Sequence, residues 1–276
     1  MNLTSKRFVK GLIKKYRAPP SKKLGQNFLI DKGVVKKIIK SANLKRKDNI
    51  LEIGPGLGTL TLELAKKAKK VIAIEKDPKM IEILKETLKN FKNVEIVQGD
   101  ILKISNSQFL ISNYKVVANL PFYLTAPVIR KFLEAKNPPK EMILMVQKEV
   151  GQRICACPPK MSILAVSVQF YAKAEIISWV SKKSSWPQPK IDSAIIKITP
   201  KKPTIKLGLV DLFFKVVKAG FSQPRKQLIN NLSKKLKMDK EKVKNWLFKN
   251  AIEPKQRAET LTVKDWLNLT KSFKIK

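Results

Sequence analysis

Three of the chain's 10 glycines fall within five residues, at Gly54, Gly56 and Gly58, directly after the apolar run 50–53. A strand that runs into a tight glycine turn and then a helix offers backbone N–H groups to a ligand at the first crossover of an α/β fold. The spacing G-x-G-x-G differs from the G-x-G-x-x-G of dinucleotide-binding folds. The turn therefore predicts a ligand site and disfavours NAD.

Two carboxylates stand at equivalent places farther along the chain. Glu75 ends the next apolar run, 71–74, and Asp100 follows the third run, 94–97. Neighbouring parallel strands end at one edge of a sheet, so both acids should flank the glycine turn. One carboxylate can accept both ribose hydroxyls and the other an adenine amino proton. Because two negative charges would repel a pyrophosphate, these residues favour an adenosine without phosphates, as in S-adenosylmethionine.

A fourth apolar run, 115–118, ends in Asn119, Leu120, Pro121 and Phe122. A side-chain amide followed by a proline-fixed turn holds two acceptors, the amide oxygen and a backbone carbonyl, in one rigid place. Both can accept hydrogen bonds from an exocyclic amine, while an adjacent aromatic ring can stack on a base. The segment predicts a pocket for a nucleobase beside the adenosine site.

These residues meet only if a parallel sheet brings their strand ends together. The order of apolar runs and helical patterns along the chain predicts such a sheet. Short apolar runs alternate with helical patterns, which is typical of α/β domains. Five strands are expected at 50–53, 71–74, 94–97, 115–118 and 142–146, and two more, at 166–172 and 193–199, as a hairpin-like finish to the sheet. Helices are expected at 32–42, 59–69, 78–90, 126–135, 207–219, 225–235, 240–250 and 263–272.

Charge and periodicity divide the chain. Lys and Arg number 58 against 21 Asp and Glu, a net charge of +37 that predicts a polyanion, RNA or DNA, as partner. The charge is densest at the two ends, and the period becomes helical after the motif at 200–203. We expect a basic N-terminal arm over residues 1–20, an α/β domain over 21–200 and a helical, RNA-contacting domain over 201–276.

Composition also excludes several chemistries. The chain has no histidine, which removes Ser-His catalysis, imidazole bases and metal sites that need an imidazole ligand. Its two cysteines, Cys155 and Cys157, are expected to be reduced thiols, and no metal is expected. Because no apolar stretch approaches the ~20 residues of a membrane helix, we expect a cytoplasmic protein without membrane partners.

Six motifs follow one another in order along the chain. They are KLGQNFL at 23–29, EIGPGLG at 52–58, NLPF at 119–122, QKEV at 147–150, PQPKIDSA at 187–194 and QRAETL at 256–261. Together they resemble one known family, the small-subunit ribosomal RNA adenine N6-dimethyltransferases of the kasugamycin-resistance type. The resemblance runs from about residue 20 to the C-terminus.

The resemblance implies a Rossmann-like, S-adenosylmethionine-dependent methyltransferase domain with a seven-stranded, mostly parallel sheet, followed by a small all-α domain. It implies dimethylation of two adjacent adenosines in the 3′-terminal hairpin of small-subunit rRNA, within a pre-30S-type assembly intermediate, and we expect a monomer. Asn119, Leu120, Pro121 and Phe122 would be catalytic. The cofactor site would be lined by Asn27, Leu29, Gly54, Glu75, Asp100 and Asn119.

The sequence departs from the family pattern at several places. Tyr is commonest where Phe122 stands, and Phe is usual where Ser185 stands. If that second aromatic clamps the base, the sequence leaves open whether the neighbouring Trp186 replaces it. In the helical region Pro224 stands in place of an Arg.

Three alternatives remain at this stage. A macrolide-resistance-type methyltransferase of large-subunit rRNA shares the Gln-Asn-Phe and glycine motifs, although Leu120 and residues 256–261 favour the small-subunit interpretation. A non-catalytic rRNA-binding assembly factor and a basic DNA-binding transcription factor are the alternatives from other classes.

Overall fold

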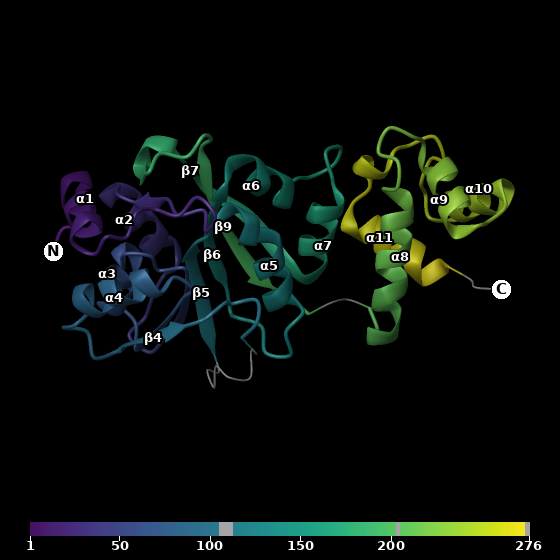
Figure 1. The fold of residues 1–276 in the computed structure, drawn as a ribbon. Helices are drawn as coiled ribbons and strands as arrows, with labels where there is room; N and C mark the ends of the chain where they lie inside the picture. The colour runs from purple at the N-terminus through teal and green to yellow at the C-terminus, as the bar shows by residue number, and fades with distance from the viewer. Residues whose placement is uncertain (105–112, 203–204, 274–276) are drawn as a thin grey trace. The chain divides into compact units, whose positions relative to one another are not determined.

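The computed structural model describes residues 1–104, 113–202 and 205–273, and these divide into two compact units (Figure 1). The first unit comprises Met1–Gly151 and Ala174–Pro200, and the second Gln152–Lys173 and Lys201–Lys276. One division between the units falls after Pro200, and residues 152–173 group with the C-terminal helices, whereas the expected domain bounds stay predictions. Pro203, the last residue of the predicted boundary motif, lies outside the described residues.

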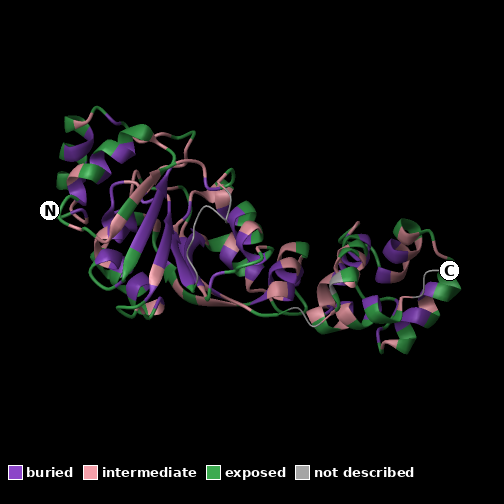
Figure 2. Ribbon diagram, turned by 90° about the horizontal axis from the view of Figure 1, so that it is seen from below, coloured by how far each residue is buried: buried purple, intermediate pink, exposed green. Residues whose placement is uncertain are grey.

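A seven-stranded sheet of order β4-β3-β2-β5-β6-β9-β7 is the centre of the first unit as described. The strands are β2 (Asn49–Ile53), β3 (Lys70–Glu75), β4 (Val94–Gln98), β5 (Tyr114–Asn119), β6 (Met142–Gln147), β7 (Ala172–Val180) and β9 (Ser193–Pro200). β2 to β6 pair in parallel, and β9 runs antiparallel to β6. Figure 2 shows the central strands coloured as buried, which fits their almost unbroken apolar sequences.

Helices begin where the sequence places capping residues. α2 (Lys32–Ser41) and α4 (Pro78–Thr87) start after Asp31 and Asp77, whose carboxylates accept hydrogen bonds from backbone N–H groups. α3 (Thr59–Ala65) starts after Gly58, which has no side chain to cap it. α5 (Thr125–Leu133) follows β5, and α6 (Lys148–Ile154) follows β6. α2 and α3 pack against the sheet in one buried apolar cluster with residues of β2, β5, β6 and β9. The predicted helices of this unit are confirmed, and α6 was not predicted.

The basic N-terminus folds as part of the first unit. α1 (Lys6–Lys15) is capped by Ser5 and buries Val9, Leu12 and Ile13. They pack in an apolar cluster with Phe28 and with residues of α4. Within the expected arm over residues 1–20, residues 6–15 therefore form a helix with one apolar and one basic face.

The expected strand at 166–172 is wrong. Ile163–Tyr171 forms α7, and β7 begins only at Ala172. Ala165, Val166 and Phe170 are buried in the core of the second unit. A helix with so little polar sequence shows no clear 3.6-residue period, so its apolar run resembles a strand.

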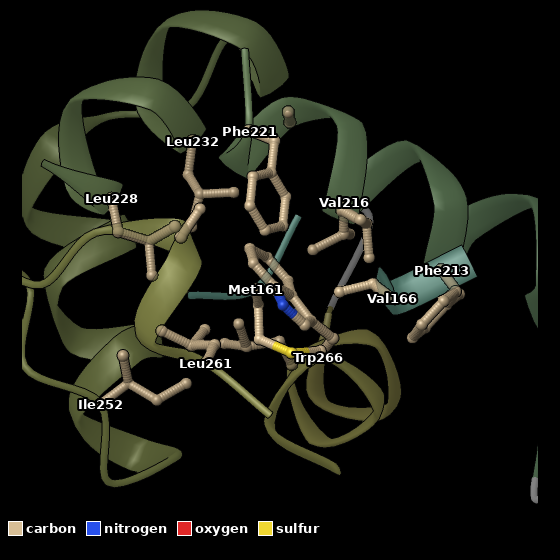
Figure 3. Close-up of a cluster of buried hydrophobic side chains, with 14 of the residues drawn as sticks. Met161, Val166, Phe213, Val216, Phe221, Leu228, Leu232, Ile252, Leu261 and Trp266 are labelled. Atoms are coloured by element: carbon tan, nitrogen blue, oxygen red, sulfur yellow. The ribbon is translucent and has the colours of Figure 1, made fainter. Parts of the chain in front are cut away.

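The second unit is otherwise helical, as predicted. α7 packs with α8 (Val210–Gly220), α9 (Leu228–Leu236), α10 (Lys240–Lys249) and α11 (Val263–Ser272). Trp266 is fully buried in this core, and its ring centroid lies 5.6 Å from that of Phe221 (Figure 3). In the described part of the chain, no helix is long and apolar enough to cross a membrane.

Candidate functional site

A cavity opens at the carboxyl edge of β2, β3, β4 and β5, within the first unit. The parallel register places these strand ends side by side, and backbone bonds extend the pairing from Gly54 to Ile74 (2.9 Å) and from Gly99 to Glu75 (2.8 Å). All the predicted catalytic and cofactor residues line this cavity: Asn27, Leu29, Gly54, Glu75, Asp100, Asn119, Leu120, Pro121 and Phe122. The structure thus brings together residues from 27 to 122, while their roles stay predictions.

The glycine turn between β2 and α3 forms one wall. Gly54, Gly56 and Gly58 have φ values of +66°, +57° and +88°, which residues with a Cβ rarely adopt. At Gly56 a Cβ would also lie 3.2 Å from ring atoms of Phe28. Both the backbone conformation and the lack of space therefore favour glycine at residue 56.

Glu75 is buried at the end of β3 and held by three backbone donors. Its Oε2 accepts from Gly56 N at 3.0 Å, and its Oε1 from Lys76 N at 2.8 Å and Asp77 N at 2.9 Å. Burial raises the pKa of this carboxyl, while the three N–H bonds oppose the rise. Since a carboxylate has about four acceptor positions, this arrangement leaves one of them free for a further donor.

The pKa of Asp100 is shifted in the opposite direction to that of Glu75. Lys76 Nζ lies 2.9 Å from its Oδ2, and Leu102 N donates to its Oδ1 at 3.0 Å. The Lys76 ammonium holds the pKa of Asp100 below its usual value, so this carboxylate is ionised at neutral pH. It can act as an acceptor on the cavity wall, and the adenine contact that the sequence analysis expects for it stays a prediction.

Asn119 connects the end of β5 to the N-terminal loop. Its Nδ2 donates to the carbonyl oxygen of Asn27 at 3.2 Å, so its Oδ1 points the other way across the amide. Leu120 is buried and donates its N–H to Met145 O at 3.1 Å, which fixes the start of the Pro121 turn. The half-buried Phe122 and Tyr123, which is 51% exposed, follow on the cavity wall.

The N-terminal loop is fixed at two points. Gln26 donates from Nε2 to Asp77 Oδ2 at 2.8 Å, and its Oε1 accepts from Ser21 N at 2.8 Å. Next to it β1 (Phe28–Leu29) pairs antiparallel with β8 (Ser185–Trp186). The loop is therefore held against α4 on one side and a second short sheet on the other.

Alternation along β8 decides the question about Trp186. Ser185 lines the cavity, whereas Trp186 packs in the cluster that contains α1, with Lys10 Nζ 5.8 Å from its ring centroid. Successive residues of a strand point to opposite faces, so Trp186 cannot replace an aromatic at residue 185. The small Ser185 leaves this part of the wall without a ring.

Glu52 is a cavity residue to which the sequence analysis gave no role. It is 2% exposed, and burial raises its pKa to about 8. The Thr61 side chain opposes this rise, and the neighbouring Glu75 charge adds to it. Among the described residues, its Oε2 has no hydrogen-bond partner. An acid inside the apolar run 50–53 was the available signal, because an unpaired carboxyl is costly to bury.

Comparison with known proteins decides the family. The family described as ribosomal RNA adenine dimethylase matches residues 20–274. The chain belongs to this family. Similar members include the "Ribosomal RNA small subunit methyltransferase A" of Dehalococcoides mccartyi strain BAV1, 43% identical over 94% of this chain and 90% of the relative. The protein of that name from Clostridioides difficile strain 630 is 40% identical over 96% of this chain and 94% of the relative.

Solved structures agree with this dimethylase fold. A dimethyladenosine transferase from Plasmodium falciparum matches with a TM-score of 0.74 and 30% identity, over 87% of this chain and 95% of that one. The 23S rRNA methyltransferase ErmE matches with a TM-score of 0.75 and 25% identity, over 89% of this chain and 99% of that one. Together with the sheet topology, they confirm the predicted Rossmann-like methyltransferase fold with its mostly parallel sheet.

Proposed function

We propose that this dimethylase transfers methyl groups from S-adenosylmethionine to the N6 amines of two adjacent adenosines in the 3′-terminal hairpin of small-subunit rRNA. One observation carries the proposal. The cavity joins a glycine turn and two carboxylates, suited to an adenosine, to the Asn119–Phe122 segment, suited to an amine on a flat base. The 43% identity to a relative named for the small ribosomal subunit supports the choice of RNA.

The residues present fit the cofactor. The glycine turn at residues 54–58 has three positive φ values and no side chains at its glycines, so a ligand can approach its backbone closely, and among the described residues Glu52 Oε2 is a buried polar atom without a hydrogen-bond partner. Glu75 would accept from the ribose and Asp100 from the adenine amino group, with Asn27, Leu29, Gly54 and Asn119 completing the wall. The bound cofactor supplies an electrophilic methyl group on a sulfonium, whose departure leaves a neutral thioether that needs no protonation.

The chain's own contribution is alignment of the target amine. The Asn119 Oδ1 and the Leu120 carbonyl would accept hydrogen bonds from N6, which draws its lone pair out of the ring and fixes its direction. Pro121 keeps these acceptors in place, and Phe122 would stack on the base once it leaves its own stack. Positioning of this kind lowers barriers by up to ~7–11 kcal/mol, which explains how a site without histidine can work.

RNA binding is assigned to the basic surfaces. We infer that α1 and the C-terminal helical unit hold rRNA phosphates, as a net charge of +37 would favour. We also infer that the protein works as a monomer in the cytoplasm, on a pre-30S-type assembly intermediate. Such an intermediate would have to leave the target bases unpaired, because proteins recognise RNA bases mainly in single-stranded loops and ends.

Transfer of labelled methyl groups from S-adenosylmethionine tests the proposal. Purified protein is mixed with small subunits or 3′-hairpin RNA lacking the modification, or with naked large-subunit rRNA, and the products are mapped by mass spectrometry. Two dimethylated adenosines in the hairpin are expected. Because the fold also matches a 23S rRNA methyltransferase, label in large-subunit rRNA alone would support that alternative. No label in any RNA would leave only a non-catalytic RNA-binding role.

A further inference from the structure

Trp179 is an exposed tryptophan outside the cavity. The chain has four tryptophans, all among the described residues. Trp266 and Trp246 are buried and Trp186 packs beside α1, whereas Trp179 on β7 is 48% exposed. A tryptophan that leaves about half of its surface exposed on an edge strand is available for contact with a ligand, and tryptophan is enriched at binding interfaces.

The surroundings of Trp179 combine apolar and cationic groups. Lys148 Nζ, at the start of α6, lies 5.6 Å from the ring centroid of Trp179. Ile177, two residues earlier on the same strand face, is 43% exposed. Ile191 is 36% exposed and precedes Asp192, whose carbonyl accepts the Lys148 N–H at 3.0 Å. We call Lys148, Ile177, Trp179 and Ile191 the Trp179 platform.

The charge near the platform is mostly positive. Lys182, Lys183 and Lys190 are the next basic residues along the chain. The nearby Asp192 carboxylate accepts the Lys182 N–H at 3.1 Å, and Lys182 Nζ lies 3.5 Å from the carbonyl of Lys190. Lys182, Lys190 and Asp192 thus form one hydrogen-bonded network beside the platform.

The platform adjoins the cavity. Pro189 and Ser193 line the cavity, and residues 190–192 run directly between them. Gln147 at the end of β6 pairs with Ser193, and Lys148 is the next residue. The platform therefore borders the cavity on the β6–β9 side, beyond the Asn119–Phe122 segment.

We propose that the Trp179 platform binds an unpaired nucleotide next to the target adenosine, with its base stacked on the indole and its phosphate beside Lys148. This inference rests on the proposed function. Aromatic rings with adjacent cations bind single-stranded RNA because every base has a flat face and every nucleotide a phosphate. A second copy of the chain is disfavoured, because each copy carries a net charge of +37.

Tryptophan fluorescence tests the contact directly. In the wild type, acrylamide quenches the exposed Trp179, and saturating 3′-hairpin RNA or an unstructured RNA oligonucleotide should protect it. In W179F this protected component should be absent, while the signal of the three other tryptophans remains. Quenching that RNA leaves unchanged in the wild type would overturn the proposal, whether or not the protein methylates the RNA.

A matched pair of variants separates stacking from general apolar contact. W179F keeps an aromatic face, and W179L keeps apolar bulk without one. The Kd for the same RNAs should rise about 5- to 150-fold in W179L and no more than about threefold in W179F. Unchanged melting temperatures and cofactor affinity serve as controls, since the side chain is exposed.

The outcomes distinguish this inference from the proposed function. A wild type that methylates the hairpin, with all three proteins binding RNA equally, overturns the platform alone. Equal RNA binding combined with loss of a ribosomal-protein contact in W179L would assign the surface to a protein and also overturn it. Absence of methylation by the wild type contradicts the proposed function, while the fluorescence result still decides the platform.

Discussion

The three carboxyl groups around the cavity differ in charge state because their surroundings differ. Glu52 and Glu75 are buried, and burial raises the pKa of both, to about 8 for Glu52. Asp100 lies beside the Lys76 ammonium, which lowers its pKa. Glu52 is thus largely protonated at neutral pH, whereas Asp100 is ionised. A neutral Glu52 limits the negative charge that two adjacent buried carboxyls would otherwise place together.

Asn119→Ala should abolish most turnover. The variant removes the Oδ1 acceptor for the target amine, and we expect the turnover rate to fall about 100-fold or more, as misplacement of a reacting group does. Cofactor affinity should change less than about threefold, because Glu75 and Asp100 remain. Single-turnover kinetics on hairpin RNA and calorimetric titration with S-adenosylmethionine measure the two effects. Turnover equal to that of the wild type would contradict the role assigned to Asn119.

Glu52→Gln should change how stability depends on pH. With a pKa of about 8 in the folded protein against a usual value of 4.5, Glu52 binds its proton more tightly when folded. The wild type therefore loses stability as pH rises between these two values, and this loss is complete above about pH 8. The melting temperature of E52Q minus that of the wild type should increase from pH 5 to pH 8 and then level off.

The exposed Glu82 provides the control for that series. E82Q also removes one carboxyl, from the solvated face of α4. Its melting temperature should stay parallel to that of the wild type over the same range. An E52Q difference that is constant with pH would show that Glu52 is ionised in the folded protein throughout.

At the residue scale, the sequence could not predict in which direction a side chain points. Glycine spacing and strand-end acids predicted which residues meet at the cavity, because parallel strands end together. The sequence could not decide between Ser185 and Trp186, since the answer depends on which face of β8 points inward. The three backbone bonds to Glu75 were equally out of reach, because they depend on the exact turn geometry.

At the scale of elements, hydrophobic periodicity predicted the helices that have one solvent-exposed face. The predicted ranges 32–42, 78–90 and 240–250 overlap α2, α4 and α10 closely. It failed at α7, whose apolar sequence is surrounded by the second unit's core. It also missed the two-residue strands β1 and β8, which exist only through their pairing. Tertiary contacts, which a local pattern does not contain, decided both cases.

Gly220→Ala should destabilise the helical unit. A Cβ at Gly220 would overlap the ring of Trp266 and approach Leu228 Cδ1 to 3.1 Å. Because Trp266 is fully buried, it cannot move aside without disturbing the core in Figure 3, and we expect a loss of about 1–3 kcal/mol. Denaturant unfolding followed by circular dichroism measures this loss.

Gly11→Ala is the matched control for that substitution. Gly11 lies inside α1 with nothing within 4 Å of an added Cβ. Here alanine should stabilise the protein by up to ~0.5–1 kcal/mol, because it favours the helix over the unfolded chain. If G220A and G11A shifted stability in the same direction and by the same amount, close packing around Trp266 would not be the cause.

At the scale of the whole molecule, the excess of positive charge lies on the surface. Some of the acids lie at the cavity, and others form buried ion pairs, as where Lys115 Nζ lies 3.2 Å from Asp48 and 2.8 Å from Glu141. Most of the 58 basic residues are left on the surface. Such a surface attracts RNA from any direction, so affinity alone carries little information on sequence. The cavity and the Trp179 platform would then decide which nucleotides are held.

Removal of charge from α1 should reduce the salt dependence of RNA binding. Lys6, Arg7 and Lys14 are exposed on α1, and Arg7 and Lys14 lie on the face opposite its buried residues. If each contacts a phosphate, the triple glutamine variant should lower the slope of log K against log salt by about 2–3, since one contact contributes about 0.7–0.9. Filter binding of hairpin RNA at several salt concentrations measures the slope.

Three lysines near the amino ends of the strands, at the end of the sheet opposite the cavity, supply a control for this variant. Lys69, Lys89 and Lys92 are also exposed, and they lie close to the amino ends of β3 and β4, away from the cavity. Glutamine at these three positions removes the same charge but should lower the slope by less than about 1, because a general field effect is weaker than a phosphate contact. Equal slopes for the two triple variants would mean that α1 contributes only to the net charge. A slope lowered by the α1 variant alone would place RNA along this helix.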